Sequence, residues 1–213
     1  MTMSEENPLK PEHFRRNDES PDSLFYVEAR LVTHIDDRAI AAVTAFYGEL
    51  LPSGGHVLDL CSSWVSHLPG ELNYGSVTGL GMNQVELDAN PVLTRRVVQD
   101  LNANPLLPFA DGEFDGAVIT VSVQYLTRPA EVFAEVGRCL KPGAPFIITY
   151  SNRCFPTKAV LIWQSLGNRE HADLIGLYLR LSEKFGPSRA YDLSPQPAGS
   201  SDPLFAVAAN RMP

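Results

Sequence analysis

Apolar residues recur along this chain at two spacings, one typical of helices and one typical of buried strands. Between residues 36 and 50 they follow at three- and four-residue steps, which predicts an amphipathic helix with Asp36 or Asp37 capping its first turn. Further helices are expected at residues 83–89, 129–140 and over most of 157–186. Short apolar runs bounded by turn-forming residues predict strands at residues 56–60, 76–80, 95–99, 114–121, 145–150 and 204–209.

Strands and helices alternate along the chain. Parallel strands need long crossover connections, so this order predicts an α/β fold in three layers, with helices on both faces of a mostly parallel sheet. In such sheets ligands bind beyond the carboxyl ends of the strands, and functional residues are expected directly after each strand. The pattern leaves open whether residues 64–68, which Pro69 and Gly70 cut short, form a helix after the first strand.

The length of 213 residues fits one domain with an appended segment, because a typical domain has roughly 150 residues. Residues 1–22 are mostly charged or turn-forming and contain Pro8, Pro11 and Pro21, so we expect a flexible N-terminal tail. Residues 23–213 are expected to form a single domain.

Composition and charge narrow the function classes. Acidic residues outnumber basic ones by 25 to 17, and the formal net charge of −8 argues against a nucleic-acid partner, which needs a Lys/Arg surface. The three cysteines show no C-x-x-C spacing, which indicates reduced thiols and a cytoplasmic location. No apolar run approaches the roughly 18 to 20 residues of a membrane span, and no membrane association is expected.

Several short motifs follow one another in the order and spacing of one enzyme family. They are Val57-Leu58-Asp59-Leu60, Val77-Thr78-Gly79-Leu80, Gln99-Asp100-Leu101, Leu107-Pro108-Phe109, Phe114-Asp115 and Leu140-Lys141-Pro142-Gly143. From about residue 36 to 209 the chain therefore resembles the class I S-adenosylmethionine-dependent methyltransferases, of the methyltransferase type 11 kind. The resemblance implies a Rossmann-like, seven-stranded sheet whose last strand is antiparallel. It also implies methyl transfer from S-adenosylmethionine, with S-adenosylhomocysteine as product.

Two positions depart from the family pattern. The turn after the first strand is Cys61-Ser62-Ser63-Trp64, and its first and third residues stand where the family has glycines that let the backbone approach the cofactor. We expect φ below zero there, or a ligand held further away. Gly81 stands where the family has an acidic residue that binds both ribose hydroxyls. That loss is worth roughly 1.5 to 3 kcal/mol, unless Asn83 or Glu86 substitutes.

The resemblance also assigns cofactor contacts by position. Asp59 would anchor the first loop and the methionine ammonium group, Asp100 would accept from the adenine amino group, and Met82 would pack on the adenine face. A solvated strand end or a loop cap is the competing interpretation of both aspartates. The cofactor-binding residues implied in this way are Asp59, Cys61, Ser62, Gly81, Met82, Asn83, Asp100, Leu101 and Ser122.

Methyl transfer from a sulfonium starts from an activated electrophile, so alignment and exclusion of water can supply most of the acceleration. A base is optional, and His34 and Tyr125 are the candidates. Family members commonly cover their substrate with an N-terminal segment, here a helical lid at residues 23–50, although packing on the sheet explains its apolar residues equally well. The expected substrate contacts are Tyr26, Arg30, Gln124, Tyr125, Asn152 and Arg153.

Missing motifs limit the reaction further. No metal-ligand spacing or phosphate-binding loop occurs, so no metal is expected. Ser122-Val123-Gln124-Tyr125 replaces the Asn/Asp-Pro-Pro-aromatic motif of amino-group methylation, which favours a small-molecule acceptor over a nucleobase.

A non-catalytic, methyltransferase-like scaffold that has lost the cofactor is the main alternative. A nicotinamide-dependent oxidoreductase is another alternative, but this chain lacks the G-x-G-x-x-G motif of that class. The acceptor atom, the pathway and the oligomeric state stay open.

Overall fold

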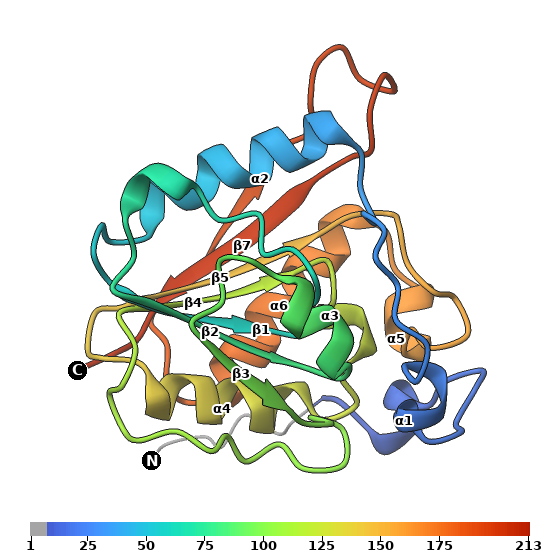
Figure 1. Ribbon diagram of the computed structural model, residues 1–213. Helices are drawn as coiled ribbons and strands as arrows, with labels where there is room; N and C mark the ends of the chain where they lie inside the picture. Colours follow the sequence, from blue (N-terminus) through green and yellow to red (C-terminus); the bar gives the residue numbers. More distant parts are fainter. Residues whose placement is uncertain (1–7) are drawn as a thin grey trace.

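Within residues 8–213, which a computed structural model describes, the chain forms a seven-stranded, mostly parallel sheet (Figure 1). The strands lie in the order β3-β2-β1-β4-β5-β7-β6, and β7 is antiparallel to both of its neighbours. This order confirms the expected Rossmann-like sheet with its antiparallel last strand. The strands are β1 His56–Leu60, β2 Ser76–Gly81, β3 Arg95–Val98, β4 Gly116–Thr120, β5 Pro145–Tyr150, β6 Arg189–Asp192 and β7 Phe205–Asn210.

Helices cover both faces of this sheet, with α2 over one face and α4 and α6 over the other (Figure 1). Because side chains alternate along a strand, Val57 of β1 belongs to the apolar core under α2, whereas Leu58 belongs to the core under α4. No helix in the described part of the chain is long and apolar enough to cross a membrane. The helices are α1 Asp22–Phe25, α2 Asp37–Leu50, α3 Gln84–Ala89, α4 Pro129–Cys139, α5 Leu161–Gln164 and α6 Asn168–Leu181, with 3₁₀ turns η1 Pro11–Phe14, η2 Gly70–Leu72 and η3 Val123–Tyr125.

Most predicted elements are confirmed to within a few residues. The helix predicted at residues 36–50 is α2, and the carboxylate of its N-cap Asp36 accepts from the backbone N–H groups of Arg38 and Ala39 at 3.1 and 3.0 Å. The segment 157–186 is largely helical, as predicted, and contains the two helices α5 and α6. No helix follows β1 over residues 64–68. The strand β6 was not located from the sequence because it is mostly exposed and carries no apolar run.

The flexible tail stays a prediction, since residues 1–7 lie outside the described residues, but residues 11–22 hydrogen-bond to the domain. The backbone N–H of Asp18 donates to the Thr157 carbonyl oxygen at 2.9 Å, and that of Leu161 donates to the Arg15 carbonyl oxygen at 2.8 Å. Two carboxylates of this segment, those of Asp18 and Asp22, also pair with the buried Lys158 of the domain. The predicted helical lid is also only partly helical, since residues 26–36 between α1 and α2 contain no helix.

Candidate active site

A cavity of about 330 Å³ lies beyond the carboxyl ends of β1, β2, β3 and β4. The loops after these strands, the loop after β5 and the N-terminal segment form its wall. Of the residues predicted to bind the cofactor, the wall contains Cys61, Ser62, Gly81, Met82, Asp100, Leu101 and Ser122. Of the predicted substrate contacts and bases, it contains Tyr26, Arg30, His34, Tyr125 and Arg153. Parallel strands bring these distant positions to one edge of the sheet.

Four predicted site residues lie outside the cavity wall. Asp59 is buried beneath the loop after β1. Asn83 caps α3, and its side-chain amide donates to two carbonyl oxygens of the N-terminal segment at 3.0 and 3.2 Å. Gln124 is fully buried and donates to the backbone just after β4 at 2.8 Å, while Asn152 is exposed. The structure therefore gives these four residues no place in the wall itself.

The loop after β1 keeps a glycine-like turn without a glycine. Cys61 has a φ of 53°, in the left-handed region, so the φ below zero that we expected does not occur at this residue. The backbone N–H of Ser62 donates to the Leu80 carbonyl oxygen at 2.8 Å, which continues the pairing with β2 beyond the end of the strand. Val121, after β4, has a φ of 43°, which is rare for a β-branched residue. Backbone strain at cavity-lining residues is typical of functional sites.

The buried carboxylate of Asp59 anchors the loop after β1. Its Oδ2 accepts from Ser62 Oγ at 2.6 Å and from Ser66 Oγ at 2.7 Å. Asn90 in turn donates from Nδ2 to Ser66 Oγ at 2.8 Å. Burial raises the pKa of Asp59 to about 6, because these hydrogen bonds offset only part of the loss of water. The carboxyl group anchors the loop, and its contact with a cofactor ammonium group stays a prediction.

Residues 26–36, here called the covering segment, close part of the cavity. Glu86 Oε1 accepts from the backbone N–H of Arg30 at 2.7 Å, and Trp64 Nε1 donates to the Val32 carbonyl oxygen at 3.0 Å. Glu86 also accepts through Oε2 from Ser63 Oγ at 2.7 Å. A single carboxylate therefore links α3, the loop after β1 and the covering segment.

The Arg30 guanidinium stacks on aromatic rings beside the cavity. Its central carbon lies 4.5 Å from the centroid of the Phe25 ring and 5.4 Å from that of Phe155. Nη2 donates to the Phe25 carbonyl oxygen at 2.8 Å, whereas Nη1 is buried and has no hydrogen-bond partner among the described residues. The stacking and the Nη2 hydrogen bond fix the guanidinium in the cavity wall, with Nη1 enclosed by protein atoms.

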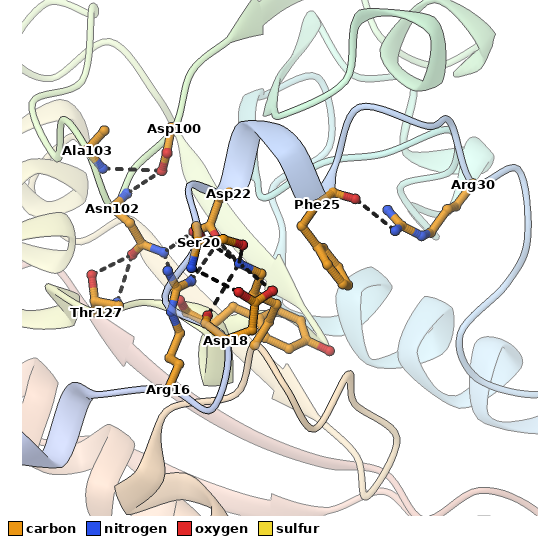
Figure 2. Close-up of polar contacts among 12 residues, drawn as sticks. Arg16, Asp18, Ser20, Asp22, Phe25, Arg30, Asp100, Asn102, Ala103 and Thr127 are labelled. Carbon is orange, nitrogen blue, oxygen red and sulfur yellow. Dashed lines mark hydrogen bonds and ion pairs between the residues drawn. The ribbon is translucent and has the colours of Figure 1, made fainter.

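Figure 2 shows how the N-terminal segment is attached beside the cavity, through Arg16, Asp18, Asp22 and Asn102, an arrangement we call the N-terminal clasp. Arg16 Nη1 lies 2.7 and 2.8 Å from the two carboxylate oxygens of Asp22, and Asn102 Nδ2 donates to Asp22 at 2.8 Å. Lys158, which is fully buried, lies 3.1 Å from Asp18 Oδ2 and 3.2 Å from Asp22 Oδ1. Asp22 and Asn102 both line the cavity. Sequence reasoning missed them because no local motif joins residues 80 positions apart.

The two candidate bases differ in their ability to accept a proton at pH 7. Both ring systems contact Phe155, at centroid distances of 5.3 Å for His34 and 5.9 Å for Tyr125. Burial lowers the pKa of His34, which keeps its imidazole neutral at pH 7 and able to accept a proton. Burial raises the pKa of Tyr125 to about 12, and its hydroxyl oxygen already accepts from the Phe155 backbone N–H at 2.8 Å. Only His34 is therefore in the form that a base requires.

Comparison with known proteins agrees with this geometry. Residues 62–148 match the family model described as a methyltransferase domain. A demethylmenaquinone methyltransferase of Lactiplantibacillus plantarum is 32% identical over 124 residues, which are 54% of this chain and 52% of that protein. Residues 62–148 are thus similar to a methyltransferase domain, and the sheet has the fold of S-adenosylmethionine-dependent methyltransferases. The chain spans about half the length of that curated relative.

Solved structures share the fold of this methyltransferase domain at low sequence identity. A Thermotoga maritima protein described as a possible histamine N-methyltransferase aligns with a TM-score of 0.60 at 16% identity, covering 83% of this chain and 91% of that one. A putative methyltransferase in complex with the Haloferax volcanii activator Trm112 gives 0.59 at 14% identity, with 83% and 92% covered. The [4+2]-cyclase SpnF gives 0.57 at 17% identity, with 80% of each chain covered. These likenesses show the fold alone.

The cavity fits S-adenosylmethionine in its chemistry. This cofactor carries a carboxylate, amino groups, a ribose diol and an adenine ring. Arg30 places a positive charge in the cavity wall, and the carboxylates of Glu86 and Asp100 offer acceptors to donor groups. Met82 and Leu101 add apolar surface for a ring. Among the described residues, no group of three or more His, Cys, Asp or Glu side chains is arranged to hold a metal ion.

Proposed function

We propose that this protein transfers the methyl group of S-adenosylmethionine to a small-molecule acceptor. The cavity carries the proposal, because it gathers at one sheet edge most of the residues that the family resemblance implies for cofactor binding. The methyltransferase match over residues 62–148 runs from the loop after β1 into β5 and includes the loops that follow β2, β3 and β4.

When bound, S-adenosylmethionine supplies a methyl group already activated on a sulfonium. The chain therefore has to bind the cofactor and the acceptor, to orient them, and to exclude water. Asp100 and Leu101 hold the adenine end, and the strained turn at Cys61 brings backbone close to the methionine end. The covering segment, with Tyr26 in the wall, limits access of water. These roles follow from position in the cavity and are open to the tests below.

The acceptor side of the cavity lies between the covering segment and the loops after β4 and β5. Tyr26, Tyr125 and Phe155 provide aromatic surface there, and His34 provides a neutral base for an acceptor that loses a proton. The similar proteins are named for different acceptors, among them demethylmenaquinone and geranyl diphosphate, so we carry over only the reaction class.

A non-catalytic scaffold is the second candidate function. Its basis is the loss of the usual acid, since Gly81 stands at that position. Against it, Cys61 keeps the left-handed turn, and the carboxylates of Glu86 and Asp100 still line the cavity. Affinity for the cofactor separates the two functions.

The decisive experiment is calorimetric titration of the purified protein with S-adenosylhomocysteine and, separately, with NAD. We expect micromolar binding of the first and no binding of the second. Asp100→Ala should weaken the binding at least tenfold, because it removes the acceptor proposed for the adenine amino group. Asp88→Ala is the matched control, since it removes an exposed carboxylate outside the cavity wall.

Absence of binding of either ligand at millimolar concentration would favour the scaffold. Binding of NAD alone would favour an oxidoreductase. Micromolar binding of S-adenosylhomocysteine justifies a screen of small acceptors for methyl incorporation.

A further inference from the structure

The position at which the family has its ribose-binding acid is closed by backbone in this protein. A Cβ at Gly81 would lie 2.2 Å from the Ser62 carbonyl oxygen, a distance that real side chains do not adopt. The Ser62 N–H donates to the Leu80 carbonyl oxygen at 2.8 Å, which fixes the loop over β2. A side chain at residue 81 therefore requires the Ser62 carbonyl group to move, and a bound ribose needs its acceptor elsewhere.

Among the described residues, three carboxylates line the cavity, those of Asp22, Glu86 and Asp100. The carboxylate of Asp22 is engaged by two cations, Arg16 of the N-terminal clasp and the buried Lys158. Asp100 follows β3, and its Oδ1 accepts from two backbone N–H groups of its own turn. Glu86 is 8% exposed and forms no ion pair within residues 8–213. In this described part of the chain Asp100 and Glu86 both lack a cation, and of the two it is Glu86 that is hydrogen-bonded to Ser63, the residue after the one whose carbonyl closes position 81.

Glu86 retains hydrogen-bonding capacity on both of its oxygens. Oε2 accepts from Ser63 Oγ and Oε1 accepts from the Arg30 backbone N–H, each at 2.7 Å. A carboxylate oxygen has two lone pairs, so one acceptor site remains on each oxygen. Ser63 directly follows the residue whose carbonyl closes the Gly81 position, which places the carboxylate beside that position. Two free acceptor sites on one carboxylate match the two hydroxyl donors of a vicinal diol.

We propose that Glu86 binds the ribose hydroxyls of S-adenosylmethionine, in place of an acid at residue 81. This inference rests on the proposed function, because it specifies how the same cavity holds the cofactor. Glu86 also accepts from the Arg30 backbone N–H. Ribose binding and the placement of the covering segment therefore depend on one carboxylate.

The test is calorimetric titration of the full chain with S-adenosylhomocysteine and with its 2′-deoxy and 3′-deoxy analogues. Wild-type protein should bind each deoxy analogue about 10- to 100-fold more weakly, since a charged acceptor loses its donor. Glu86→Gln keeps an acceptor oxygen and an amide donor for the two protein contacts. It should bind S-adenosylhomocysteine about tenfold more weakly and discriminate against the deoxy analogues by less than about threefold. Asp88→Asn, on the same helix, should keep both wild-type values.

The ratio of the affinity for S-adenosylhomocysteine to the affinity for a deoxy analogue decides the outcome. If Glu86→Gln weakens all ligands by one common factor and keeps the wild-type ratio, Glu86 only holds the covering segment, and the inference is overturned. A wild-type ratio near one overturns it as well. If wild-type protein binds no S-adenosylhomocysteine, the proposed function itself fails. Thermal unfolding identifies misfolded variants, and Glu86→Asp, which keeps the charge on a shorter side chain, should give an intermediate ratio.

Discussion

Two buried aspartates of this protein have pKa shifts of opposite sign. Asp22 is 5% exposed and faces Arg16 and Lys158, whereas Asp59 is 2% exposed and faces two serine hydroxyls. Burial acts to raise both pKa values. For Asp22, hydrogen bonds from Arg16 and Asn102 and the nearby cations outweigh it and hold the pKa below its usual value. The comparison teaches that the charge of the partner, more than burial, decides whether a carboxylate is stabilised.

The two aspartates therefore change stability in opposite directions with pH. Asp22 has a lowered folded-state pKa, so its contribution is present above the unfolded-state pKa and is lost as the pH falls through the folded-state pKa. Asp59 has a folded-state pKa of about 6, above that of an unfolded chain. Its contribution is complete below the unfolded-state pKa and is lost as the pH rises through about 6.

The largest effect is expected from Asp22→Ala, which leaves Arg16 and the buried Lys158 without their shared carboxylate. Breaking a buried ion pair from one side costs about 4 kcal/mol in the free energy of unfolding at pH 7. Urea denaturation measures it. The control is Asp111→Ala, whose side chain is 82% exposed in its ion pair with Arg138 and should cost less than about 1 kcal/mol. Equally small losses in both variants would show that Asp22 stabilises the folded state no more than an exposed carboxylate does.

A smaller effect is expected from Asp59→Asn. The amide oxygen still accepts from Ser62 and Ser66, but the group no longer titrates. Relative to wild type, the variant should gain about 2 kcal/mol in the free energy of unfolding between pH 4 and pH 7.5, because wild-type Asp59 loses its proton in this range. Urea denaturation at the two pH values gives the difference. A variant that loses stability relative to wild type as the pH rises would show that Asp59 has a partner of opposite charge.

The smallest effect is expected from Ser66→Ala, which removes one donor from Asp59. A hydrogen bond to an ionised group is stronger than one to a neutral group, so the variant should lose about 1 kcal/mol more at pH 7.5 than at pH 4. The same denaturation series measures it. Ser165→Ala is the control, because the exposed Ser165 hydroxyl donates to a backbone carbonyl oxygen and has no titrating partner. An equal loss at both pH values would separate Ser66 from the ionisation of Asp59.

Elements with a strong local pattern were predictable from the sequence. The bounds of β1 and β5 match the predicted ranges, because both strands are apolar runs between turn-forming residues. The edge strand β6 lacks such a run, since most of its residues are exposed. The contacts of the N-terminal segment were not predictable for a related reason. Its charges read as solvated, but Lys158, far along the chain, pairs with Asp18 and Asp22.

For the candidate site, the sequence located the strand ends at which Cys61, Asp100 and Ser122 line the cavity. It did not reveal that Cys61 would keep a left-handed turn, nor that Ser62 would close the Gly81 position. Both depend on how closely the loop after β1 packs on β2. Glu86 was one of two possible substitutes in the sequence, and only its contacts with Ser63 and Arg30 distinguish it from Asn83.

The sequence by itself determined the order of strands and helices and the positions at which ligands are expected, because these depend on apolar periodicity and turn residues within short windows. Only the tertiary structure decided which side chains surround the cavity and how each is charged. The pKa of Asp59, the pairing of Asp22 and the free acceptor sites of Glu86 all depend on burial and on partners distant in the sequence. No local pattern encodes the solvation of a carboxylate, which is set by what the folded chain packs around it.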